Sequence, residues 1–180
     1  MTAVALFLGL LIDHFVGEAK RWHPLVGFGN AASGLEKAAN PSSDSEGKLH
    51  GLVCWGLMVL IPVMAISLVV SQLSGLALLV VNALVVYFVV GLKSLAEHGR
   101  NVAVPLLAGD LLTARQQIAM MVSRDTDKLT EQQVASATCE SVLENGSDAI
   151  FSALFWFFLL GAPGAILYRG ANTLDAMWGY

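Results

Sequence analysis

The chain has 180 residues, of which 56% are apolar and only 13% charged, whereas a soluble domain carries about 25% charged residues. This composition, with a mean hydropathy of +0.66, favours an integral membrane protein over a soluble domain. A formal net charge of −4 without a basic stripe excludes nucleic acid as a partner. The two cysteines, Cys54 and Cys139, have the spacing of neither a disulfide framework nor a zinc site.

The first apolar stretch, residues 2–17, is short for a membrane span and carries Asp13 and His14, so we expect it to lie partly in the membrane interface. No basic residue precedes it and no small-residue cleavage pattern follows it, so we do not expect a removable signal peptide. The polar segment 38–48 has the composition of a solvated loop.

A helical hairpin is predicted over about 52–92. Its two apolar runs, 52–70 and 73–92, each have about the 20 residues that a bilayer-spanning helix needs. Only Ser71 and Gln72 separate them, so the turn must be tight. Pro62 predicts a kink in the first run, which neighbouring helices can accommodate.

Residues 94–148 are the only polar stretch long enough to form a helical segment outside the bilayer. Asp110 is placed to cap an amphipathic helix that continues towards Val122. Thr130 and Gln133 form a capping-box pattern at the start of a helix over about 131–145, and Asn145-Gly146 is typical of a helix stop.

The last apolar segment, 149–168, contains Gly161-Ala162-Pro163-Gly164, which should break a helix. The segment is therefore either a broken span or a re-entrant segment. We expect an all-α, multi-pass protein with one membrane domain over 1–180 and a cytoplasmic helical insertion at 94–148. The positive-inside rule supports this orientation, because the hairpin leaves nine of the ten basic residues on one face: Lys20, Arg21, Lys37, Lys48, Lys93, Arg100, Arg115, Arg124 and Lys128.

Three carboxylates, Glu140, Glu144 and Asp148, recur every fourth residue directly before this apolar segment. Like charges at that spacing repel, and anions beside a membrane lose water, so they need partners. The cluster is either a solvated face or a site for a hard cation such as Mg²⁺, which proteins commonly hold with one or two carboxylates plus substrate phosphates.

Three further places carry candidate functional groups. Arg124 is suited to a bidentate grip on phosphate or carboxylate, although Arg124-Asp125-Thr126 also fits an ordinary turn. His23 precedes Pro24, and a lone histidine of this kind is often structural. The segment 169–180 carries Asn172 and Asp175, although Thr173 could simply cap a helix there.

These pieces occur in an order that resembles the CobD/CbiB family of cobalamin biosynthesis, the adenosylcobinamide-phosphate synthases. The chain has Glu18-Ala19 where family members usually have Asp-Pro, and the family pattern continues beyond Tyr180, so the resemblance is to the N-terminal part. The matching pieces are Asp13 with Gly17, His23-Pro24, SLAEH at 94–98, AGDLLTARQQIAMMVSRDT at 108–126, ESVLENGSD at 140–148 and GAPGAILYRGANTLDAMWGY at 161–180.

The resemblance implies an ATP-dependent amide ligation in the cytoplasmic (inner) membrane, joining the corrinoid cobyric acid to aminopropanol or its O-phosphate. It implies Mg²⁺ as cofactor, bound by Glu144 and Asp148, with Glu140, Glu144 and Asp148 as the catalytic group for nucleotide binding or proton abstraction. The substrate-binding set that it implies is Arg124, Asp125, Thr126, Asn145, His23, Asn172 and Asp175. Because Asn172 and Asp175 must then share a site with the acidic cluster, we predict that 149–168 does not cross the membrane.

Two alternatives remain open at this point. One is an AmpE-like regulatory membrane protein without ligand-binding carboxylates. The other is a transporter fragment, in which Asp13 and Asn82 would be the important intramembrane polar residues. Membrane lipid is an expected partner in each case, and a homo-oligomer or a complex with other corrinoid-pathway proteins is an open expectation.

Overall fold

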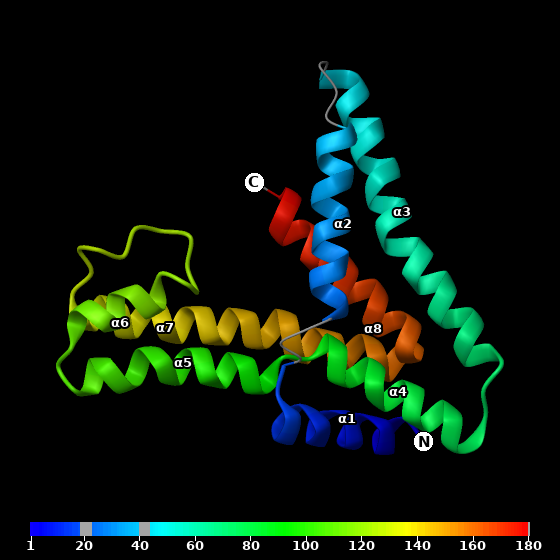
Figure 1. Cartoon of the computed structure of the whole chain (residues 1–180), viewed down its shortest axis with the longest axis horizontal. Coiled ribbons are helices and arrows are strands. Elements are labelled where there is room, and N and C mark those ends of the chain that lie inside the picture. The colour runs from blue at the N-terminus through cyan, green and yellow to red at the C-terminus, as the bar shows by residue number, and fades with distance from the viewer. Residues whose placement is uncertain (19–22, 40–43, 180) are drawn as a thin grey trace.

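The computed structural model describes residues 1–18, 23–39 and 44–179, and every regular element within these ranges is helical. Figure 1 shows a bundle of crossing helices from which a helical arm projects. The elements are α1 Thr2–Val16, α2 Pro24–Ala39, α3 Asp44–Ser71, α4 Gly75–Val89, α5 Leu92–Leu107, α6 Leu111–Ile118, α7 Glu131–Asn145, the π-helix η1 Gly146–Phe151 and α8 Ser152–Trp178.

Within the described ranges, three helical stretches are long and apolar enough to cross a membrane: Leu49–Ser71, Gly75–Leu107 and Glu131–Trp178. Many of the apolar side chains described on α3 are exposed; Leu52 is 66% and Leu68 65% exposed. A continuous apolar surface of this extent is unfavourable in water and favourable in lipid. The expected class of membrane protein therefore agrees with the fold.

Helices α3 and α4 follow each other through the short expected turn, but they diverge instead of packing along their length (Figure 1). Helix α3 packs against α8 and α2, whereas α4 packs against α1 and α8. Pro62 lies inside α3, which continues through it. The expected loop at 38–48 is partly helical, since α2 ends at Ala39 and α3 begins at Asp44; residues 40–43 lie outside the described residues.

Helix α1 is held tightly to α4 and to the start of α5. The absence of a side chain at Gly9 lets α1 approach Val86 of α4 closely. The buried carboxylate of Asp13 accepts a hydrogen bond from the backbone N–H of Lys93 at 2.9 Å, and the Tyr87 hydroxyl donates to the Gly17 carbonyl oxygen at 2.9 Å. These bonds fix where the arm leaves the bundle.

The arm consists of α5, α6 and α7, which enclose a small apolar core of Val102, Ala114, Ile118, Val134 and Ala137. Both predicted caps are present. The Asp110 carboxylate accepts from the Thr113 N–H at 3.1 Å, and Thr130 and Gln133 make both bonds of the capping box. The helix after Asp110 ends at Ile118, earlier than the apolar pattern predicts.

The predicted helix stop at Asn145-Gly146 is wrong. Gly146 has right-handed helical angles (φ −63°, ψ −44°), and the chain continues through η1 into α8 without a break. The physical reason lies in the next turn, where Ile150 is buried against Val89 and Val90 of the bundle. Burying this apolar face outweighs the modest helix-breaking tendency of one glycine.

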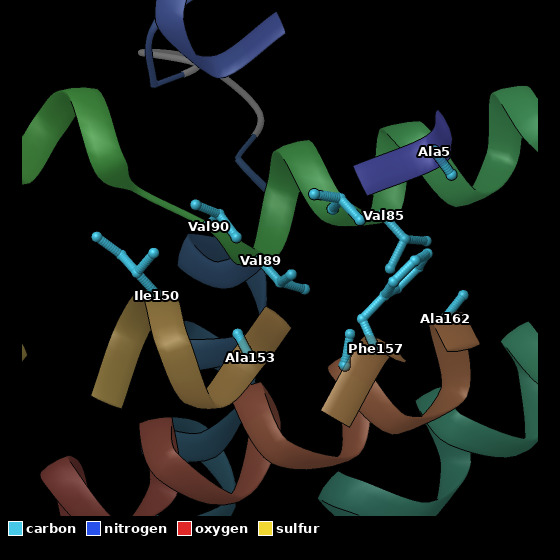
Figure 2. Close-up of a cluster of buried hydrophobic side chains, with 10 residues drawn as sticks. Ala5, Val85, Val89, Val90, Ile150, Ala153, Phe157 and Ala162 are labelled. Carbon is cyan, nitrogen blue, oxygen red and sulfur yellow. The ribbon is translucent and has the colours of Figure 1, made fainter. Parts of the chain in front are cut away.

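The predicted break in the last apolar segment is present, and it reverses the chain. Gly161 has φ 67° and ψ −155°, a backbone conformation that is strongly unfavourable for every residue except glycine. After it, Gly164 packs directly on the Trp156 carbonyl, so the two limbs of α8 cross in close contact. Figure 2 shows Phe157 of the first limb reaching towards the valines of α4, with Ala162 of the second limb beside it.

Candidate functional site

A cavity of about 760 Å³ lies where the loop after α6, the end of α7, η1 and the end of α8 meet. This volume is within the range of about 300–1,000 Å³ that is usual for small-molecule sites. Both ends of the reversing segment contribute residues to the lining of this cavity, because the break at Gly161 brings the end of α8 back to the start of η1.

Seven of the ten residues predicted for the site line this one cavity. They come from three separate parts of the sequence, and their gathering is a consequence of the fold. Their roles in binding and catalysis remain predictions. The seven are Arg124, Glu140, Glu144, Asn145, Asp148, Asn172 and Asp175.

The three clustered carboxylates face the cavity because of the helix that carries them. In an ideal α-helix four residues turn through 400°, so positions four apart drift by about 40° each time. Asp148 lies in η1, whose wider i→i+5 turn reduces that drift. Glu140, Glu144 and Asp148 therefore stay on one side, and π-turns of this kind are frequent at functional sites.

Arg124 and Glu140 form an ion pair across the cavity mouth, with 2.9 Å between Nη2 and Oε2. Their side chains are 56% and 64% exposed. Exposed pairs of this kind contribute about 0–1 kcal/mol, so a ligand oxyanion can displace Glu140 from Arg124 at little cost. The pair thus holds the guanidinium beside the cavity and leaves it able to exchange Glu140 for a ligand.

Asn145 and Ser141 brace the wall of the cavity. The Ser141 hydroxyl donates to the Met121 carbonyl oxygen at 3.2 Å, and the Asn145 amide nitrogen donates to the Ser141 carbonyl oxygen at 2.8 Å and to its hydroxyl at 3.2 Å. Both bonds of Asn145 use its amide nitrogen, which leaves its carbonyl oxygen as the atom for a ligand.

The structure does not bring Asp125 and Thr126 into the cavity. Thr126 is buried, and its hydroxyl donates to the Arg115 carbonyl oxygen at 3.1 Å. The Asp125 carboxylate accepts from the Asp127 N–H at 2.9 Å within the turn. Both side chains shape the loop that presents Arg124 and lie outside the lining of the cavity, so their part in substrate binding stays a prediction.

His23 also lies away from the acidic cavity. Its ring is buried edge-on against Phe88, and Nδ1 accepts from the Leu25 N–H at 3.2 Å at the start of α2. Burial lowers the pKa of this imidazole. The adjoining residues Pro24 and Leu25 line a separate apolar cavity of about 430 Å³, so a contact between His23 and a corrin ring remains a prediction.

The donor set at the acidic cavity is suited to a cation only in combination with other oxygen ligands. Carboxylates and an amide carbonyl are the hard oxygen donors that Mg²⁺ prefers. Within the described part of the chain, however, no three His, Cys, Asp or Glu side chains are close enough together to hold a metal ion. The arrangement therefore fits Mg²⁺ that is shared with ligand phosphates, and it does not fit a cage made by the protein alone.

Arg169 is the residue that sequence reasoning missed as a site candidate. It lies on the second limb of α8 and lines both the apolar cavity and a third cavity of about 330 Å³. Its signal in the sequence is an arginine directly after the apolar segment 149–168, since a charged residue at membrane depth generally marks function.

A family model described as CobD/Cbib protein matches residues 6–180, almost the whole chain. The chain belongs to the CobD/CbiB family. Neither the regulatory nor the transporter alternative is favoured by this match. The CobD/CbiB motifs that carried the resemblance all lie within the matched residues.

Several CobD proteins are similar over nearly the entire chain. A protein named cobalamin biosynthesis protein CobD from Chromobacterium violaceum is 49% identical over 99% of this chain and 58% of its own length. The protein of the same name from Stutzerimonas stutzeri is 50% identical over 95% of this chain and 56% of its own length. The chain therefore spans somewhat more than half of the relatives it matches. No solved structure matches it.

Proposed function

We propose that this chain carries the nucleotide and carboxylate site of an adenosylcobinamide-phosphate synthase in cobalamin biosynthesis. The observation that supports the proposal most directly is the single cavity in which Arg124 and the carboxylates of Glu144, Asp148 and Asp175 gather. The CobD relatives are named for cobalamin biosynthesis, and the chain covers 58% of one of them at 49% identity.

The proposed reaction joins a propionate side chain of cobyric acid to the amine of aminopropanol or of its O-phosphate. A carboxylate is a poor acyl donor, so one of its oxygens first takes the γ-phosphoryl group of ATP and ADP leaves. The amine then attacks the acyl carbon, phosphate departs with that oxygen, and the amine loses a proton. The sum is one amide bond formed, one phosphoanhydride bond broken, and ADP, phosphate and a proton released.

Each part of the cavity has a proposed role in this reaction. Arg124 exchanges Glu140 for a phosphate or for the activated carboxylate, and Glu140 is then free to accept the proton of the amine. Asn145, Asn172 and Asp175 orient the substrates. Glu144 and Asp148 would hold Mg²⁺ together with phosphate oxygens, and the bound ion would supply positive charge beside the phosphates.

The proposed location is the cytoplasmic membrane, with the arm and the acidic cavity on the cytoplasmic side. The exposed apolar surface of α3 supports placement in lipid. The basic residues of the arm, including Lys93, Arg100 and Arg115, support the cytoplasmic side. Lys20 and Arg21 lie outside the described residues.

Membranes that contain the chain, mixed with cobyric acid, ATP, Mg²⁺ and aminopropanol O-phosphate, test the proposal. Mass spectrometry is expected to find the amide product, and omission of ATP or Mg²⁺ should remove it. Free aminopropanol in a parallel reaction identifies the preferred amine. Membranes with the longer Chromobacterium violaceum relative are the positive control. Amide formation without ATP would contradict the proposal.

A further inference from the structure

Arg169 is a partly buried cation that makes no side-chain hydrogen bond or ion pair with another described residue. Its Nε–H is fully buried and has no hydrogen-bond acceptor there, whereas Arg124 is paired with Glu140. A guanidinium has five N–H donors and stays charged under all physiological conditions. Because an unpaired buried charge destabilises a fold, an arginine kept in this state needs a reason other than folding.

The third cavity, which we call the Arg169 compartment, offers that reason. It has a volume of about 330 Å³ and is lined by Ser94 and His98 of α5, Asn145 and Arg169, among others. The start of α5 adds the partial positive charge of a helix N-terminus, although Asp13 already accepts from the Lys93 N–H there. The groups in this lining that favour an anion thus come from three helices, α5, α7 and α8.

One carboxylate bears on the Arg169 compartment. Glu18 lines it and acts electrostatically on Arg169, but the two side chains form no ion pair within the described structure. The Glu18 side chain is exposed, so water screens its charge more than that of a group inside the compartment. Glu18 therefore leaves the donors of Arg169 available.

The Arg169 compartment adjoins the acidic cavity. Met121 and Asn145 line both, so the two spaces lie on either side of the same wall. The acidic cavity presents carboxylates, and the Arg169 compartment presents a guanidinium. Together they suit a ligand with two oxyanions, one held to the carboxylates through a cation and one bound directly by Arg169. The reversal at Gly161 creates this arrangement, because it returns Arg169 and Asp175 to the helix that carries Asp148.

We propose that Arg169 binds an oxyanion, a phosphoryl or carboxylate group of a ligand, in the compartment beside the acidic cavity. The identity of the ligand rests on the proposed function, since phosphate would come from ATP or the aminopropanol ester and carboxylate from the corrinoid. The oxyanion site itself rests on the position and unpaired state of Arg169. Its forked donors suit both groups.

Binding of inorganic pyrophosphate and of propionate to the purified chain in detergent, measured by calorimetry, tests the site and distinguishes the two sources. Arg169→Gln is expected to weaken binding of the preferred probe at least tenfold. Arg169→Lys keeps the positive charge but lacks the forked donors, so its affinity should lie between those of Arg169→Gln and the wild type. The matched control is Arg100→Gln, which removes an exposed arginine of α5 that lines none of the three cavities. This variant should bind the probe with wild-type affinity.

Thermal unfolding separates ligand binding from a structural role. Arg169→Gln should melt at or above the wild-type temperature, because it removes a cation that has a buried, unsatisfied Nε–H and no ion-pair partner among the described residues. Melting well below wild type would make Arg169 structural and overturn the proposal. Wild-type protein that binds neither probe, or an Arg169→Gln variant that binds with wild-type affinity, would also overturn it.

The amide assay distinguishes failure of this site from failure of the proposed function. Pyrophosphate or propionate binding that depends on Arg169, without any amide product, would support the oxyanion site and contradict the ligase. Amide formation at the wild-type rate in Arg169→Gln would support the ligase and overturn the oxyanion site.

Discussion

Asp13 shows how one buried carboxylate can organise a membrane fold. It lies in the apolar helix α1, is only 1% exposed, and accepts a hydrogen bond from the Lys93 N–H in the first turn of α5. The N-cap of that helix is Gly91, which has no side chain to supply the bond. Asp13 therefore caps a helix that lies 80 residues further along the chain.

Replacement of Asp13 by leucine should lower the free energy of unfolding by about 1–3 kcal/mol, because it leaves a buried N–H without an acceptor. Asp13→Asn keeps an acceptor oxygen and should cost less. Chemical denaturation in detergent measures both changes. The neighbouring His14→Leu, at an exposed position, is the control. Equal stability of the leucine variant and wild type would show that the bond to Lys93 is dispensable.

Glu144→Gln and Asp148→Asn should each reduce Mg²⁺-dependent amide formation by about 100-fold or more, which is the size of effect seen when one electrostatic group is removed from an active site. Affinity for Mg²⁺·ATP, measured by calorimetry, should fall as well. Folding and membrane insertion should not change, because both side chains are exposed.

The matched control for these two variants is Glu97→Gln, which changes an exposed carboxylate on α5 that lines none of the cavities described. It should retain both activity and affinity. Near-normal turnover in the Glu144 and Asp148 variants would remove the acidic cavity from the reaction.

At the scale of elements, the broken helix α8 determines where the site forms. Its first limb carries the chain away from Asp148, and its second limb returns Asn172 and Asp175 to the same cavity. The turning point is one glycine with a positive φ of 67°. An L-residue at Gly161 would favour continuing the helix, and that would carry Asp175 away from Asp148.

Gly161→Ala should lower the free energy of unfolding by about 1–3 kcal/mol, the usual cost of a side chain in this backbone region. Mg²⁺·ATP affinity should fall with it, because the two halves of the cavity separate. Gly34→Ala is the control. It lies in α2 with open space around it, so it should be neutral or stabilising by up to about 1 kcal/mol. A Gly161→Ala variant with unchanged stability and affinity would contradict this account.

At the scale of the whole molecule, the fold has two ends of different character. Figure 1 shows the N-terminus and the α3–α4 turn on the right, with the arm on the left and the end of α8 between them. The acidic cavity lies between the arm and the end of α8. A membrane between the two ends would leave the α3–α4 turn on one side and both edges of the acidic cavity on the other.

Cysteine labelling in sealed cells with a membrane-impermeant reagent tests this arrangement. In a Cys54→Ser background, the exposed Cys139 on α7 and an Ala176→Cys substitution at the exposed end of α8 should both stay unlabelled until the cells are opened. Ser74→Cys at the exposed α3–α4 turn, in a background that also carries Cys139→Ser, should react at once.

Labelling of position 176 from outside would show that α8 crosses the membrane completely. The acidic cavity could not then contain both Asp148 and Asp175.

Local features of this protein could be predicted from the sequence because their causes are local. The caps at Asp110 and Thr130 depend on residues two or three positions away, and the break at Gly161 depends on one glycine followed by a proline. The clustering of Glu140, Glu144 and Asp148 on one side also follows from helical periodicity. The stop at Gly146 was mispredicted because burial of Ile150 is a tertiary effect.

The composition of the site was decided only by the tertiary structure. Whether Thr126 points into a cavity or into its own loop depends on Arg115, and whether Arg169 has a partner depends on the packing of α8 against α2, α3 and α4. Such contacts join residues far apart in the sequence, and no periodicity or spacing encodes them. The sequence by itself determined helices, caps, a break and a group of anions, whereas the close packing of the two limbs of α8 determined which of those groups share a cavity.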